Sequence, residues 1–307
     1  MTIVFKASPN IQQKMIEHYS YCMREKKPPY SVFQAVEADT VITLYESGKV
    51  MFQGISADID ANLWIDMEKH LNNRVIDINN KDSKTKEKNK GMVFLNTVGS
   101  DEVGTGDFYG PIVVTSTYVS KENIGFLSDL GVKDSKVVTD EKIIKIAPQI
   151  MKRIPHCTYI LTNEMYNKVY SESYNMNRIK AVLHNKVLFD LMAKEEYPYD
   201  KIVVDQFVYP KKYYEHIREE KNKVSHITFE TKAESRYMSV AASSIISRYI
   251  FLQEMDKLSK QYNINIPLGA GDQADIVGKE LLKQYGKDIF SKIAKLNFKN
   301  IQKITEK

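Results

Sequence analysis

A ten-residue segment without any apolar side chain divides this chain and limits what each side of it can fold into. Residues 81–90 read KDSKTKEKNK, with five lysines. Because such a segment buries no apolar surface, it is predicted to be a flexible, solvated linker. The chain is therefore predicted to form a smaller unit over residues 1–80 and a larger unit over residues 91–307.

The composition is typical of a globular protein. Hydrophobic residues make up 43% of the chain and charged residues 27%, a balance that argues against a mostly disordered protein. No run approaches the roughly 18 apolar residues of a membrane span, and the first residues lack the apolar core of a secretory signal. Only two cysteines occur, Cys22 and Cys157, far apart. A disulfide framework is thereby excluded, and a cytoplasmic protein without membrane contact is expected.

The positive charge is concentrated near the C-terminus. The net charge is +5, and residues 279–307 carry all of it, with eight lysines and three acidic residues. A basic segment of this kind is suited to phosphate contact. It is equally typical of the solvated face of a helix, so the charge alone leaves both interpretations open.

The part before the linker is predicted to be a small α/β unit. Ser8 is a candidate N-cap for a helix that begins at Pro9 and has apolar residues at helical spacing. A hairpin is predicted around Ser47-Gly48, and a second short helix over residues 60–71. None of these residues forms a catalytic pattern, so this unit is interpreted as a binding or scaffolding module.

The part after the linker alternates predicted strands with predicted helices, which favours an α/β fold with a central sheet. The strand candidates are residues 92–98, 111–119, 157–162 and 201–204, and the helix candidates are residues 141–152, 177–194, 235–260 and 275–285.

Carboxylates follow apolar strand sequence at three places. Asp101 and Glu102 follow the first predicted strand, Asp205 ends the strand at residues 201–204, and Glu234 precedes a helix of small residues. Carboxylates at strand ends in α/β proteins lie where ligands bind. If they converge, a hard divalent cation such as Mg²⁺ or Mn²⁺ compensates their repulsion, and two such ions can support phosphoryl transfer without a protein base.

A more ordinary interpretation applies to each carboxylate alone. A single aspartate at the end of a strand is commonly a turn former or a helix cap. The adjacent pair Asp101-Glu102, followed by Gly104-Thr105-Gly106, is less ordinary, because two neighbouring carboxylates in apolar surroundings need a reason. The pattern indicates a metal site without identifying the substrate.

Four motifs in order give the chain a specific resemblance. VGSDEVGTGDFYGPIVV (98–114) resembles the first active-site motif of the type 2 ribonucleases H. GVKDSK (131–136), VVDQF (203–207) and TKAESRYMSVAASSIISRY (231–249) follow in that family's order. The long N-terminal extension, with SGKVMFQG at 47–54, is similar to the bacterial ribonuclease HIII branch.

This resemblance implies a fold and an activity. The fold would be an RNase H-like α/β domain with a central mixed sheet flanked by helices, preceded by a small α+β domain like the TATA-box-binding protein. The activity would be hydrolysis of the RNA strand of RNA/DNA hybrids, leaving 3′-hydroxyl and 5′-phosphate ends. Catalysis would use Mg²⁺ or Mn²⁺, with two ions. The implied metal-binding and catalytic residues are Asp101, Glu102, Asp205 and Glu234.

The resemblance also implies substrate contacts. Backbone groups of the loop Gly104-Thr105-Gly106 would read the ribose 2′-hydroxyl, which distinguishes RNA from DNA. The family's HII members have arginine where this chain has Thr105, which favours cleavage within longer RNA tracts over cleavage at single ribonucleotides. The remaining implied contacts are Lys133, Ser135, Lys136, Asn177 and Arg178.

Several alternatives stay open on the sequence. The protein could cleave at single ribonucleotides in DNA like an HII enzyme, or bind hybrids without cleaving them. Asn177 could cap a helix instead of contacting substrate. The tyrosines that follow Asp205 could stack on bases or pack in the core. A monomer without an obligate protein partner is expected.

Overall fold

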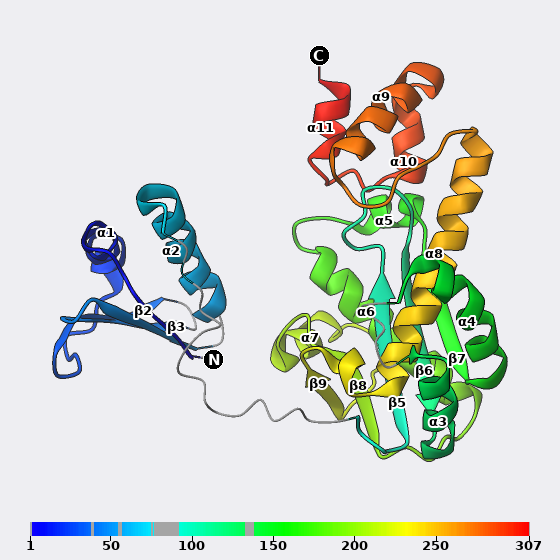
Figure 1. Ribbon diagram of the computed structural model, residues 1–307, viewed down its shortest axis with the longest axis horizontal. Helices are drawn as coiled ribbons and strands as arrows, with labels where there is room; N and C mark the ends of the chain where they lie inside the picture. Colours follow the sequence, from blue (N-terminus) through cyan, green and yellow to red (C-terminus); the bar gives the residue numbers. More distant parts are fainter. Residues whose placement is uncertain are drawn as a thin grey trace. The chain divides into compact units, whose positions relative to one another are not determined.

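The computed structural model describes residues 2–37, 40–54, 57–74, 76, 92–132 and 138–306. The chain divides into two compact units, Met1–Lys88 and Asn89–Lys307, and each is considered by itself (Figure 1). The predicted linker at residues 81–90 lies outside the described residues. Of the helices described, none combines the length and the apolar character that a membrane span needs.

The first unit is a four-stranded antiparallel sheet with helices on one face. Its strands are β1 (Thr2–Lys6), β2 (Ser31–Glu37), β3 (Thr40–Tyr45) and β4 (Lys49–Gly54), in the order β1-β4-β3-β2. The helices are α1 (Pro9–Tyr19), followed by a 3-10 turn (Ser20–Cys22), and α2 (Ala57–Asn72). Both lie on the same side of the sheet (Figure 1), because alternate strand residues face a core that contains Trp64. The predicted hairpin is confirmed, with Gly48 at a φ of +78° in its turn.

Ser8 begins α1 as predicted, but its side chain does not cap the helix. Its hydroxyl donates instead to Glu68 Oε2 at 2.7 Å, and its amide donates to Glu68 Oε1 at 2.5 Å. Burial alone would raise the pKa of Glu68, but the two hydrogen bonds from Ser8 bring it below its ordinary value. The buried carboxylate of α2 thus ties the start of α1 to the second helix.

The second unit is built on a mixed five-stranded sheet. Its strands are β5 (Thr97–Val103), β6 (Ile112–Val119), β7 (His156–Leu161), β8 (Lys201–Asp205) and β9 (Ile227–Glu230), in the order β7-β6-β5-β8-β9. The pairs β5–β8 and β8–β9 are parallel, and the other pairs are antiparallel. The predicted α/β class with a central mixed sheet is confirmed, as is the small sheet unit before it.

Helices cover both faces of this sheet (Figure 1). The long helix α8 packs on one face with α3 and α4 outside it, and α6 packs on the other. A helical cluster of α9, α10 and α11 surrounds the far end of α8. The helices are α3 (Lys121–Asp129), α4 (Asp140–Arg153), α5 (Asn163–Val169), α6 (Met176–Lys194), α7 (Pro210–His216), α8 (Met238–Tyr262), α9 (Asp272–Tyr285), α10 (Phe290–Ile293) and α11 (Asn300–Thr305), with 3-10 turns at Ala233–Ser235 and Lys287–Ile289.

The first strand of this unit differs from its prediction. Residues 92–98 were expected to form it, yet β5 begins at Thr97 and continues through the carboxylate pair to Val103. The strand continues past Ser100 because its last residues are still paired with one neighbouring strand. The parallel partner β8 pairs with β5 as far as Ser100, whereas the antiparallel partner β6 pairs with it as far as Val103. Asp101 therefore lies within β5, just beyond the last residue that β8 pairs with.

Candidate active site

The two adjacent carboxylates of β5 point to opposite faces of the sheet. Successive side chains of a strand alternate between faces, so Gly99 and Asp101 face α8 while Ser100 and Glu102 face α6. On the α8 side, Ser243 Oγ donates to the carbonyl of Gly99 at 3.0 Å. On the α6 side, Ser100 Oγ lies 2.8 Å from His184 Nδ1. The pair that forms one acidic unit in the sequence therefore belongs to two different environments.

Small residues bring α8 close to β5. Ser247 Oγ donates to the carbonyl of Asp101 at 3.1 Å, and the hydroxyls of Thr97 and Ser239 lie 2.8 Å apart. Ser244, on the same helix, hydrogen-bonds to the carboxylate of Asp101. These contacts support the interpretation that the serines of α8 serve close helix–sheet packing, and they fix the position of Asp101.

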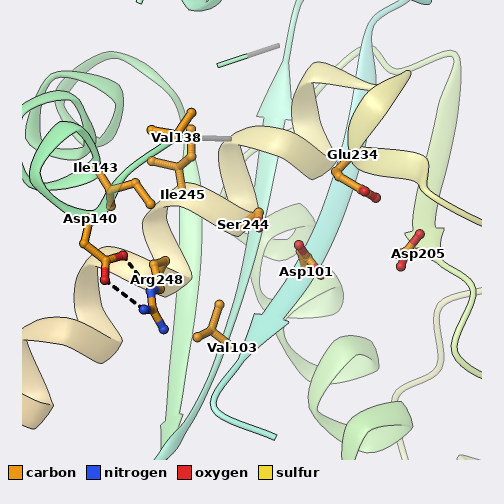
Figure 2. Close-up of a pocket in the computed structure, with 10 residues that line it drawn as sticks. All are labelled: Asp101, Val103, Val138, Asp140, Ile143, Asp205, Glu234, Ser244, Ile245 and Arg248. Atoms are coloured by element: carbon orange, nitrogen blue, oxygen red, sulfur yellow. Dashed lines mark hydrogen bonds and ion pairs between the residues drawn. The ribbon is translucent and has the colours of Figure 1, made fainter. Parts of the chain in front are cut away.

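Three of the four sequence-predicted carboxylates line one pocket of about 470 Å³ (Figure 2). Asp101 comes from β5, Asp205 is the last residue of β8, and Glu234 lies in the 3-10 turn before α8. The backbone amide of Ala233 donates to Asp205 Oδ1 at 2.9 Å, so the turn that carries Glu234 also orients Asp205. Lys232 adopts a left-handed conformation, with a φ of 56°, where the chain bends into this turn.

The electrostatics of the pocket favour a cation. Burial raises the pKa of Asp101 well above its ordinary value, and the negative charges of Glu102 and Asp205 raise it further. Within the described ranges, no three His, Cys, Asp or Glu side chains are already arranged to hold a metal ion. The donor chemistry nevertheless fits a hard divalent cation, because three carboxylates line the same pocket and carboxylate oxygens are the ligands that such ions prefer.

Glu102 lies outside that pocket and is held by helix α6. It forms an ion pair with Lys180, and its Oε2 lies 2.8 Å from His184 Nε2. Burial alone would raise the pKa of Glu102, but the hydrogen bond and charge of His184, with the charge of Lys180, lower it. Lys180 and His184 lie four residues apart and so face the same way. That spacing is the signal that sequence reasoning did not use.

Comparison with known proteins places these features in a family. Residues 98–301 match the sequence family described as ribonuclease HII, and residues 2–75 match one described as a domain of unknown function, DUF3378. A ribonuclease HIII of Bacillus cereus is 37% identical over 304 residues, covering 98% of this chain and 97% of that protein. A ribonuclease HIII of Bacillus licheniformis is 38% identical over 302 residues, covering 98% and 96%. The chain belongs to the ribonuclease HIII family.

Solved structures agree with this membership. The crystal structure of Bst-RNase HIII in complex with Mn²⁺ has a TM-score of 0.68 at 34% identity, covering 99% of this chain and 98% of that one. The ribonuclease H2 of Pyrococcus horikoshii has a TM-score of 0.58 at 26% identity, covering 69% of this chain and 97% of that one. As a ribonuclease HIII family member, the protein is a ribonuclease, as its motifs predicted.

The glycine loop of the ribonuclease HIII motif has a fixed backbone. Gly104 has a φ of +97°, and a side chain there would collide with the backbone carbonyl of Pro111. Gly106 is exposed and has open space around it. The first glycine is therefore required by the fold, whereas the second leaves backbone groups open to the approach of a ligand.

A buried lysine holds the segment after this loop. Lys295 Nζ donates to the carbonyls of Asp107 at 2.9 Å and Gly110 at 2.7 Å. The side chain is fully buried, so this lysine of the basic C-terminal segment is not available for phosphate contact. Burial lowers the pKa of Lys295 to about 7, with the carboxylate of Asp107 acting in the opposite direction.

Lys295 is expected to make stability rise with pH. Between about pH 7, the pKa of Lys295 in the native protein, and pH 10.5, the ordinary pKa of a lysine, the unfolded chain holds a proton that the native lysine has released. The free energy of unfolding should therefore increase through that window. Between pH 7 and 9, wild type should gain about 2 kcal/mol relative to Lys295→Met.

The measurement is urea unfolding followed by circular dichroism, in parallel with fluorescence. The only tryptophan, Trp64, lies in the first unit, so tryptophan fluorescence follows the unfolding of that unit. A transition that circular dichroism detects and fluorescence does not is then the unfolding of the second unit. Lys292→Met, an exposed lysine of α10, is the control and should show no such slope. A pH-independent difference between wild type and Lys295→Met would contradict an uncharged native lysine.

None of the other predicted substrate contacts is found in the pocket among the described residues. Lys133, Ser135 and Lys136 lie outside the described residues. Asn177 was considered as a helix cap, but Asn175 holds that position, because its side chain accepts from the amides of residues 177 and 178. Arg178 pairs with Glu219 at 2.6 Å, and neither it nor Asn177 lines the pocket.

Two charged pocket residues were absent from the sequence-based candidates. Arg248 of α8 and Asp140 of α4 line the same pocket as the carboxylates. The sequence does carry a signal for Arg248, which lies inside the motif at 231–249 and four residues after Ser244, on the same face of the helix. Among the tyrosines after Asp205, Tyr213 is fully buried against Phe229, as the packing interpretation predicted.

Proposed function

We propose that this ribonuclease hydrolyses the RNA strand of RNA/DNA hybrids, leaving 3′-hydroxyl and 5′-phosphate ends. The observation that carries the proposal is the pocket shared by Asp101, Asp205 and Glu234. A group of carboxylates repels phosphate unless cations are present, so a protein that only binds hybrids gains nothing from it. Membership of the ribonuclease HIII family supports the same reaction.

Divalent cations belong to this proposal. Asp101, Asp205 and Glu234 would hold Mg²⁺ or Mn²⁺, and two ions are expected. The Mn²⁺ complex of a related ribonuclease HIII supports a divalent cation in this family. When bound, such ions stabilise charge on the phosphate and lower the pKa of a water molecule. Glu102 would join the set by leaving Lys180 and His184.

The glycine loop supports a preference for longer RNA tracts. Thr105 lies between Gly104, whose backbone is fixed, and Gly106, whose backbone is open. Backbone groups of this loop would read the 2′-hydroxyl. Without an arginine at position 105, the loop offers no guanidinium for a ribonucleotide–DNA junction.

The experiment uses the full chain with Mg²⁺ or Mn²⁺ and three end-labelled substrates. These are an all-RNA/DNA hybrid, a DNA duplex with one ribonucleotide, and single-stranded RNA. Cleavage of the hybrid alone is expected. Cleavage at the single ribonucleotide would favour an HII-like activity. If the folded protein binds the hybrid but cleaves it with neither Mg²⁺ nor Mn²⁺, the proposal fails and the chain is a hybrid-binding protein.

We propose further that the first unit binds the hybrid with the open face of its sheet. In the register of β1, β4 and β3, Met51 lies between Val4 and Thr43 on the face opposite the helices. Gln34 hydrogen-bonds to Thr43 on the same face at 3.0 Å. The outward side chains of these described strands include Lys6 and Lys49 but no carboxylate, which suits a polyanion.

Met51→Glu is expected to raise KM for the hybrid by about tenfold or more while kcat stays within twofold, because a negative charge enters the centre of this face. Leu63→Glu is the matched control. Leu63 is also an exposed apolar residue, but it lies on α2, on the other side of the sheet. Deletion of residues 1–80 should raise KM further. An unchanged kcat/KM in the deletion would refute the role.

A further inference from the structure

The pocket extends beyond its carboxylates and changes in character along its length. Asp205 and Glu234 lie at one side of it, Asp101 is central, and Asp140 and Arg248 lie at the other side (Figure 2). A volume of about 470 Å³ is in the range that holds an organic ligand rather than ions alone. The apolar side chains that line the pocket are Val103, Val138, Ile143 and Ile245.

Arg248 is held in one orientation. Its Nε donates to Asp140 Oδ1 at 2.9 Å, and its Nη2 donates to Asp140 Oδ2 at 2.9 Å. This two-point contact fixes the plane of the guanidinium. A guanidinium has five N–H donors, so the pair with Asp140 leaves donors for a second acceptor. The side chain is 26% exposed and is therefore accessible from the pocket.

Arg248 also has a defined distance from the carboxylates along α8. Ser244, which hydrogen-bonds to Asp101, precedes it by four residues, which is a rise of about 6 Å on the same helix face. A strand with its scissile phosphate at Asp101 would present a neighbouring phosphate towards Arg248. The planar guanidinium fork matches phosphate oxygens better than other cationic side chains do.

We propose that Arg248, oriented by Asp140, binds a second phosphate of the cleaved strand, adjacent to the scissile one. Asp140 is then a positioning residue. The apolar side chains that line the pocket contact the carbon edge of the ribose. The inference rests on the proposed function and extends it, because it assigns a phosphate subsite outside the carboxylate group.

Arg248→Gln is expected to raise KM for an RNA/DNA hybrid by about 10- to 100-fold, the value of a charge-assisted hydrogen bond. kcat should stay within threefold, and the slope of log KM against log salt should fall by about one, because one phosphate contact is lost. Lys260→Gln, on the same helix and 76% exposed, is the control and should change neither KM nor slope.

Two further variants separate charge from geometry. Asp140→Asn keeps the arginine charge but loses its orientation, so KM should rise less and the salt slope should stay as in wild type. Arg248→Lys should behave in the same way, and it keeps the test informative if Arg248→Gln does not fold. Thermal unfolding of each variant establishes that it is folded.

Chemical substitution identifies the phosphate. Hybrids carrying one neutral methylphosphonate at successive positions should reveal one position that weakens binding to wild type but not to Arg248→Gln. Equal penalties for both proteins at every position would overturn the proposal, as would a loss of kcat with KM and salt slope unchanged. If wild type cleaves no unmodified hybrid, the proposed function fails instead.

Discussion

The Asp101→Asn variant is expected to cleave an RNA/DNA hybrid at least about 10³-fold more slowly than wild type at saturating substrate. The amide keeps the size of the side chain and can still accept the hydrogen bond that the amide of Glu102 donates at 2.9 Å. It carries no charge, so the central member of the carboxylate group is lost. Single-turnover kinetics with excess enzyme measures the chemical step directly.

Binding should distinguish this loss from a folding defect. Removing one negative charge beside Glu102 and Asp205 relieves their repulsion, so the variant should bind the hybrid as tightly as wild type or more tightly. Asp190→Asn is the control. Asp190 is a half-exposed residue of α6 that pairs only with Lys186 in the described structure, and its loss should leave kcat unchanged. A rate for Asp101→Asn within tenfold of wild type would remove Asp101 from the catalytic group.

Gly99→Ala is expected to lower the free energy of unfolding of the second unit by about 3 kcal/mol or more. A Cβ at this position would lie 2.5 Å from Ser239 Oγ and 2.7 Å from the backbone nitrogen of Val240. Because one of these atoms belongs to the helix backbone, α8 must move away from β5. The hydrogen bond from Ser243 to the carbonyl of Gly99 would be lost, and Asp101 would shift with its strand.

Gly125→Ala is the matched control for this prediction. Gly125 lies within α3, and a Cβ added there would have no other atom within 4 Å, so alanine should stabilise the helix by about 0.5–1 kcal/mol. Urea unfolding followed by circular dichroism compares the two variants with wild type. An equal free energy of unfolding for Gly99→Ala and wild type would contradict the prediction, because it would mean that α8 can move away from β5 at no cost in stability.

Local sequence was sufficient for much of the fold and for the carboxylates. The four helices predicted in the second unit all form, with boundaries shifted by at most three residues. Helices α4 and α9 have one apolar face, whereas α6 and α8 are recognisable from long runs of residues that favour a buried helix. Asp101, Asp205 and Glu234 were predicted because each stands where apolar sequence meets polar sequence. Their convergence follows from the order of β5 and β8 in the sheet, which places strand ends together.

Long-range pairing explains what local sequence did not predict. Whether β5 ends before or after Asp101 depends on how far β6 extends beside it. The residues of β6 that pair with β5 lie beyond the loop that joins the two strands. Ser8 donates to Glu68, sixty residues later, rather than capping its own helix. The two-point contact that orients Arg248 in the pocket comes from Asp140 of α4, a residue distant in the sequence. Each of these features depends on a partner that a sequence window does not contain.

The alternation of β5 also limits how this region can change during evolution. Substitutions at Gly99 or Ser100 act on one face of the sheet at a time. An insertion or deletion of one residue between Val98 and Asp101 would instead exchange the faces, turning Asp101 towards α6 and Glu102 towards α8. Both the carboxylate pocket and the contact with His184 would be lost together. The strand is therefore expected to vary among relatives by replacement of residues and to keep its length.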